Sequence, residues 1–103
     1  MSGYALHPEA YEDLDEIRAY IAQDNPDAAN RMVNEIFDAI RPLVRFPDQG
    51  FRRPKLTSLP LRFVAVRDYV IAYAPEKKPL WVVAVIHGRR NPHLITAILH
   101  SRE

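Results

Sequence analysis

Apolar residues recur every three or four positions over two long stretches of the chain, which is the spacing of helices with one buried face. The first stripe, within residues 8–23, consists of Ala10, Leu14, Ile17 and Ile21. The second, within residues 26–46, consists of Ala29, Met32, Val33, Ile36, Ile40 and Leu43. Pro8 and Pro26 suit the first turn of a helix, where the N–H that proline lacks has no partner anyway. Because the connection is short, the pattern predicts an antiparallel helical hairpin with one apolar side.

The C-terminal half changes to short runs that alternate or are apolar throughout, which is typical of strands. These runs are Leu61–Val66, Tyr69–Ala74 and Leu80–His87. Their connections are short, so neighbouring strands are predicted to be antiparallel. Positions 81–86 are all apolar, which indicates cover on both faces of the last strand. The helical hairpin supplies one cover, and either the C-terminal segment or another chain supplies the other.

A short strand at residues 3–6 and a final helix at residues 92–100 complete the predicted order β-α-α-β-β-β-α. Pro42 is expected to kink or loosen the last turn of the second helix. Helices that cover an antiparallel sheet define an α+β domain with two layers. The length of 103 residues corresponds to a single domain, residues 1–103.

Composition excludes several classes of protein. The chain has no cysteine and only three glycines, so we expect no disulfide, thiolate site, cysteine nucleophile or glycine-rich phosphate loop. The four histidines lack the spacing of a helical metal site, so no metal and no cofactor are expected. The N-terminal region is acidic and no apolar run approaches about 20 residues. We therefore expect a cytoplasmic protein without a membrane partner.

Charge is divided unevenly along the chain. Residues 1–40 carry nine acids and two bases, a net charge of −7, whereas residues 41–103 carry twelve bases and four acids, a net charge of +8. The basic half is suited either to nucleic acid or to an acidic protein, or the two halves attract each other.

Basic side chains gather at the ends of the predicted strands. Because the end of the last strand of a meander can approach the start of the first, we expect one basic site there. The candidate residues are Arg62, Arg67, His87, Arg89 and Arg90. Arg52, Arg53 and Lys55 lie in the irregular segment before the strands. Guanidinium groups fit phosphate and carboxylate, and histidine titrates near neutral pH. Such a cluster cleaves RNA or holds an acidic partner, or it only protects the edge of the sheet.

The sequence resembles the RelE/ParE family of type II toxin–antitoxin toxins over nearly its whole length. The resemblance rests on segments 13–17, 20–21, 25–29, 43–50, 61–62, 69–73 and 82–90. The fold of that family is the order of elements predicted above. The RelE branch cleaves mRNA on the ribosome, and the ParE branch blocks DNA gyrase.

The resemblance favours the ParE branch, which implies gyrase inhibition without hydrolytic chemistry. RelE-type ribonucleases use an arginine on the middle strand, an arginine after the last strand and a tyrosine near the C-terminus. These align with Val70, with Arg89 or Arg90, and with Ile95 or Thr96, and no tyrosine follows Tyr73. A RelE-like mRNA endonuclease, with His87 as acid or base, remains the alternative. A third possibility is a member of the family that only binds its partner.

The resemblance also implies a ParD-like antitoxin that wraps the helical hairpin and the sheet. DNA is then contacted only indirectly, through gyrase or the antitoxin. The candidate antitoxin contacts are Leu14, Ile17, Ile21, Met32, Ile36, Tyr69, Tyr73 and Trp81. The strand aromatics either pack in the core, face this partner or stack on bases.

Overall fold

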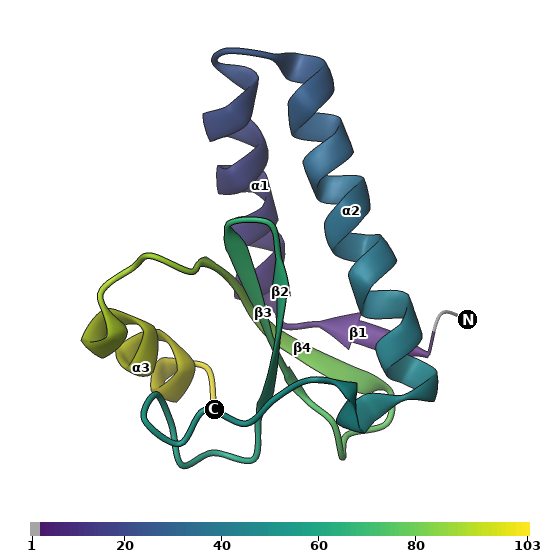
Figure 1. Cartoon of the computed structure of the whole chain (residues 1–103), viewed down its shortest axis with the longest axis vertical. Helices are drawn as coiled ribbons and strands as arrows, with labels where there is room; N and C mark the ends of the chain where they lie inside the picture. Colours follow the sequence, from purple (N-terminus) through teal and green to yellow (C-terminus); the bar gives the residue numbers. More distant parts are fainter. Residues whose placement is uncertain (1–2) are drawn as a thin grey trace.

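Two long helices, a four-stranded sheet and a C-terminal helix make up the protein (Figure 1). The computed structural model describes residues 3–103, so the first two residues of the predicted domain lie outside the described part. The elements are β1 (Tyr4–Leu6), α1 (Pro8–Ala22), α2 (Pro26–Arg45), the 3₁₀ turn η1 (Pro47–Gln49), β2 (Arg62–Val66), β3 (Tyr69–Ala74), β4 (Leu80–His87) and α3 (Pro92–Ser101). The predicted order of elements and the α+β class are confirmed.

The helices begin where the sequence predicts, and side chains cap their first turns. Asn25 accepts a hydrogen bond from the N–H of Ala28 at 3.1 Å, and the Nδ1 atom of His7 accepts one from Glu9 at 3.0 Å. These bonds satisfy N–H groups that have no partner within the helix. Helix α2 continues through Pro42 to Arg45. Pro42 is exposed, so the carbonyl that it leaves without a partner can face water.

The sheet has the strand order β1-β4-β3-β2. Strands β2, β3 and β4 form the predicted antiparallel meander. Strand β1 runs parallel to β4 at the other edge, with Tyr4 opposite Leu80 and Leu6 opposite Val82. The sheet was expected to be antiparallel throughout, and the position of the first short strand in it was not predicted. A parallel neighbour needs a long connection, and the helical hairpin and the meander together provide it.

A bulge in β4 explains why every position from 81 to 86 is apolar. Ala72 pairs with Ala84 and Tyr73 with Val82, so Val83 is an extra residue on its strand. A bulge places two successive side chains on one face. Val83 and Ala84 accordingly face α3, whereas Val82 and Val85 face the helical hairpin. The second cover of β4, left open by the sequence, is therefore the C-terminal helix.

The outer edge of β4 is completed by side chains instead of a strand. Beyond Leu6, the N–H of Val85 donates to Asp13 Oδ2 at 3.0 Å, and the carbonyl of Val83 accepts from Arg102 Nη1 at 3.1 Å. Arg102 also bonds both carboxylate oxygens of Asp13, at 2.6 and 2.9 Å. This bond with Asp13 raises the pKa of Arg102. The pair thus joins α1, β4 and α3.

The Asp13–Arg102 pair is expected to contribute strongly to stability. Asp13→Ala removes both charge-assisted hydrogen bonds of the Arg102 guanidinium, whose side chain is 10% exposed, and leaves Glu9, at 3.6 Å, as its remaining ion-pair partner. We expect the free energy of unfolding, measured by urea denaturation, to fall by about 2–4 kcal/mol. The matched control is Asp38→Ala, which removes an exposed ion pair with Arg41 and should change it by less than about 0.5 kcal/mol. Equal losses in the two variants would contradict this role.

Candidate functional site

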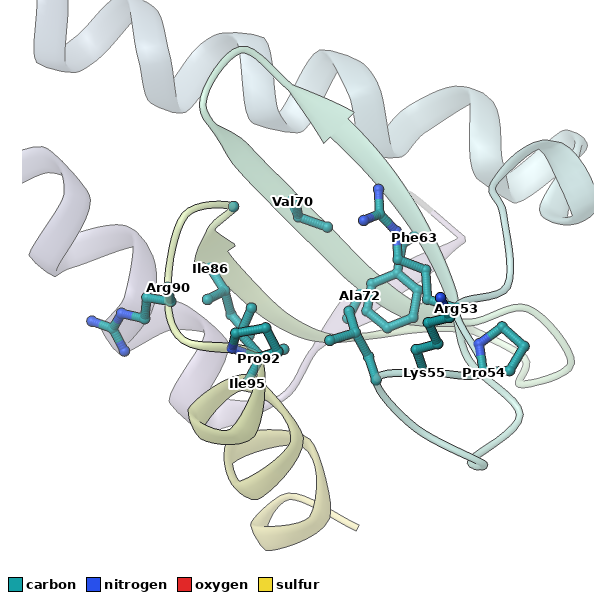
Figure 2. A pocket seen from close by; sticks show the side chains of 12 residues that line it. Arg53, Pro54, Lys55, Phe63, Val70, Ala72, Ile86, Arg90, Pro92 and Ile95 are labelled. Atoms are coloured by element: carbon teal, nitrogen blue, oxygen red, sulfur yellow. The ribbon is translucent and has the colours of Figure 1, made fainter.

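A cleft of about 520 Å³ lies on the face of the sheet that α3 covers only in part (Figure 2). The helical hairpin packs on the opposite face. The apolar side chains that line the cleft are Pro54, Leu56, Phe63, Val70, Ala72, Ile86, Pro92 and Ile95. Its polar lining consists of the cationic side chains of Arg53, Lys55 and Arg90. The cleft is therefore an apolar hollow with a basic rim.

The pairing of the strands explains the hollow. Phe51 pairs with Phe63, Phe63 with Ala72 and Ala72 with Ala84. Residues directly opposite each other on neighbouring strands project to the same face. Two alanines in this row leave space between Phe63 and α3. Phe51 lies at the outer end of the row and is 75% exposed.

Two side chains hold the loop that precedes Phe51. The hydroxyl of Tyr73 accepts from the N–H of Gly50 at 2.9 Å and donates to the carbonyl of Pro47 at 2.7 Å. Burial raises the pKa of Tyr73, so the hydroxyl keeps its proton and remains a donor. Arg62 donates to the carbonyl of Gly50 at 2.8 Å. A Cβ atom at Gly50 would lie 2.6 Å from the Tyr73 hydroxyl, so the close approach requires glycine.

A second hollow, a groove of about 700 Å³, opens between α1, the β2–β3 turn, the end of β4 and α3. His87 lies here, on the face opposite the cleft, because it pairs with Tyr69. The two rings meet edge to face with their centroids 5.4 Å apart. Nδ1 of His87 accepts from the N–H of Arg89 at 3.1 Å. Burial raises the pKa of Tyr69, and the charge of Asp68 adds to the shift.

The structure brings together some of the predicted basic residues. His87 and Arg67 line the groove, and Arg90 lines both the groove and the cleft. Arg67 adopts a φ of 54° in the β2–β3 turn. Its Nε lies 2.8 Å from Glu35, and this bond raises the pKa of Arg67. Arg89 is exposed in the turn after β4.

Arg62 does not belong to this cluster, so the prediction of one site with all five residues is wrong. Arg62 pairs with Tyr73, whereas Val66 pairs with Tyr69 and thus lies level with His87. Four residues of strand separate these levels by roughly 13 Å. In an antiparallel meander, the first and third strands run in the same direction. The start of the first strand therefore lies level with the start of the third strand and far from the end of the third. Arg62 instead supports the loop before Phe51.

Several predicted antitoxin contacts are core residues. Leu14, Ile36 and Tyr73 are at most 5% exposed, so the assignment of these side chains to a partner is wrong. The apolar stripe of a helix hairpin is the side that it turns to its own sheet. Ile17, Met32 and Tyr69 are also buried, at 6–8% exposed, and line the groove together with the half-buried Ile21. Trp81 is half-buried, and its ring lies 5.9 Å from that of His7.

Sequence reasoning missed Phe51 as a surface residue and the Asp13–Arg102 pair as a structural one. Phe51 precedes two arginines in a segment without periodicity, so only its basic neighbours indicated a binding surface. Asp13 is one of nine acids in residues 1–40, and no sequence pattern distinguishes it from the others. Among residues 3–103, no group of three or more acidic or histidine side chains is arranged to hold a metal ion. No helix in this range is long and apolar enough to span a membrane.

Comparison with known proteins identifies the family. Residues 4–92 match the family described as "ParE toxin of type II toxin-antitoxin system, parDE". Toxin RelE2 of Caulobacter vibrioides is 35% identical over 79% of this chain and 89% of its own. Toxin ParE2 of Mycobacterium tuberculosis is 26% identical over 94% and 91%. The chain belongs to the ParE toxin family of type II toxin–antitoxin systems, as the resemblance implied.

A solved structure shares the fold. The structure titled "Chromosomal ParDE TA system from P. aeruginosa" superposes with a TM-score of 0.66 at 22% identity, and the match covers 82% of this chain and 92% of that one. The toxin fold expected from the resemblance is therefore confirmed.

The hydroxyl of Tyr73 is expected to hold the Phe51 loop in place. Tyr73→Phe removes both hydrogen bonds of this buried group and should lower the free energy of unfolding by about 1–3 kcal/mol. In the same variant, hydrogen exchange at the Gly50 amide should be faster than in the unmodified protein. Tyr11→Phe, at a residue 54% exposed, is the matched control. Unchanged exchange at Gly50 in Tyr73→Phe would refute this role.

Proposed function

We propose that this ParE-family toxin inhibits DNA gyrase, without hydrolytic chemistry of its own, and that a ParD-like antitoxin neutralises it. The observation that carries the proposal is the family match, which extends from β1 to the first residue of α3. The residues that line the cleft support the absence of hydrolytic chemistry.

The cleft lacks groups for acid–base cleavage of RNA. Val70 and Ile95, which align with the arginine and a candidate position of the tyrosine of RelE-type ribonucleases, both line it with apolar surface. Among its lining residues, only arginine and lysine are titratable, and neither is matched to proton transfer near neutral pH. His87 lies on the other face of the sheet. These features favour binding over catalysis.

The RelE-like alternative has one observation in its favour, since a relative at 35% identity is named toxin RelE2. In that case the reaction would use the groove, where His87 lies with Arg67 and Arg90. His87 would then act as the acid or base of a ribosome-dependent mRNA endonuclease.

For the antitoxin, the groove is the better-suited surface. Ile17, Ile21 and Met32 give it an apolar floor, and Arg67 and Arg90 lie at its margin. An amphipathic helix that buries its apolar face in such a groove is an ordinary mode of recognition. The groove lining carries the acids Asp13, Glu16 and Asp68 as well as the bases Arg67, Arg90 and Arg102, so charged residues of either sign on the antitoxin would find a partner there.

The target is tested with purified, antitoxin-free protein in a gyrase supercoiling assay that also reports linear DNA. We expect loss of supercoiling together with accumulation of cleaved DNA. Replacing both Arg89 and Arg90 with alanine should raise the concentration needed for inhibition at least about tenfold, because two exposed cations are lost. Replacing Arg18 and Arg31, exposed on α1 and α2, is the charge-matched control. Unaffected gyrase and cleaved mRNA in arrested cells would establish the RelE-like alternative instead.

The groove is tested by titration calorimetry with the antitoxin. Tyr20 is 71% exposed and lines the groove, so Tyr20→Ala should weaken the complex by about tenfold while gyrase inhibition persists. Tyr11→Ala, on the same helix but outside the groove lining, should leave the affinity unchanged. Equal affinity for Tyr20→Ala and the unmodified protein would exclude the groove as a main contact.

A further inference from the structure

The cleft of Figure 2 combines an apolar floor with the cationic side chains of Arg53, Lys55 and Arg90. We propose that this cleft, together with Phe51 at its edge, binds a segment of single-stranded DNA directly. The proposal goes beyond the gyrase target and departs from the expectation that DNA is contacted only through gyrase or the antitoxin, because it concerns a direct contact between this chain and nucleic acid.

Phe51 provides a platform for a base. Its pairing with Phe63 places its side chain on the cleft face, and its ring is 75% exposed. Its backbone exchanges hydrogen bonds of 3.0 and 2.8 Å with Phe63, and Tyr73 and Arg62 hold the preceding loop. An exposed aromatic ring on a fixed backbone stacks on a base with little loss of conformational freedom.

The rim supplies cations for the phosphates. Figure 2 shows Arg53 and Lys55 on one side of the apolar floor and, on the other side, Arg90, whose guanidinium extends away from the floor. The guanidinium of Arg53 lies 5.9 Å from the centre of the Phe63 ring, and thus close to the floor. No aspartate or glutamate is among the residues that line the cleft. A chain of phosphates that crosses the mouth is complementary to this charge.

The floor supplies room for an unstacked base and favours deoxyribose. A volume of about 520 Å³ lies within the range of roughly 300–1,000 Å³ typical of small-ligand sites. The floor side chains of Phe63, Val70, Ala72 and Ile95 offer no hydrogen bond. A ribose 2′-hydroxyl buried there would lose its bond to water without replacement. We therefore expect DNA to bind more tightly than RNA of the same sequence.

The test measures fluorescence anisotropy of a labelled oligothymidylate with antitoxin-free toxin and without gyrase. Phe51→Ala should weaken binding by about tenfold, as expected for the loss of one base stack. Arg53→Ala should reduce the slope of log affinity against log salt by about 0.7, the contribution of one phosphate contact on a single strand. Tyr11→Ala and Arg31→Ala, which remove an exposed ring and an exposed charge outside the cleft lining, should change neither quantity.

Three results would overturn the proposal. The first is the absence of binding at low salt in protein whose circular dichroism shows that it is folded. The second is an equal loss of affinity in the cleft variants and their controls, which indicates only general attraction of charge. The third is tighter binding of oligouridylate than of the DNA. Because gyrase is absent from the assay, these outcomes do not depend on the gyrase proposal.

Discussion

Strand β4 has apolar side chains on both faces that need cover and backbone groups along both edges that need hydrogen-bond partners. The arrangement of the other elements follows from how these needs are met. Backbone groups buried without a partner are strongly unfavourable. The β3 ladder bonds one edge, and β1 bonds the start of the other. Beyond β1, Asp13 and Arg102 bond the remaining groups. The bulge at Val83 makes this possible, because it turns the backbone groups of Val83 and Val85 to that edge and divides the apolar side chains between two separate cores.

The helices and most of the strands were predictable from the sequence, because each depends on local periodicity and on a few residues that strongly favour one position, such as the start of a helix. The stripe from Ala10 to Ile21, with Pro8 before it, defines α1 within a residue or two. Asn25 and Pro26 likewise fix the start of α2. The parallel pairing of β1 was not predictable, since a strand of three residues carries no signal for its direction or its neighbour.

The sites were harder to predict because a sequence pattern does not show whether an apolar side chain is buried in the core or exposed to a partner. Ile36 and Tyr73 look like contact residues on a helix face and a strand, but both are fully buried. Arg62 was grouped with His87 by residue type, whereas strand register separates them by four positions. The cleft itself depends on Phe63, Ala72 and Ala84 being aligned across three strands, and this alignment includes a bulge that no sequence signal marks.

The Asp13–Arg102 bond also sets a time order for folding. Its partners stand 89 positions apart, so the bond closes a loop that includes almost the whole chain. During synthesis, α1 and the sheet emerge before the residue that completes the edge of β4. Until Arg102 has left the ribosome, the carbonyl of Val83 lacks its donor and the carboxylate of Asp13 lacks its counter-charge. The toxin surface, with α3 in place beside the cleft, therefore forms only after α3 has been synthesised.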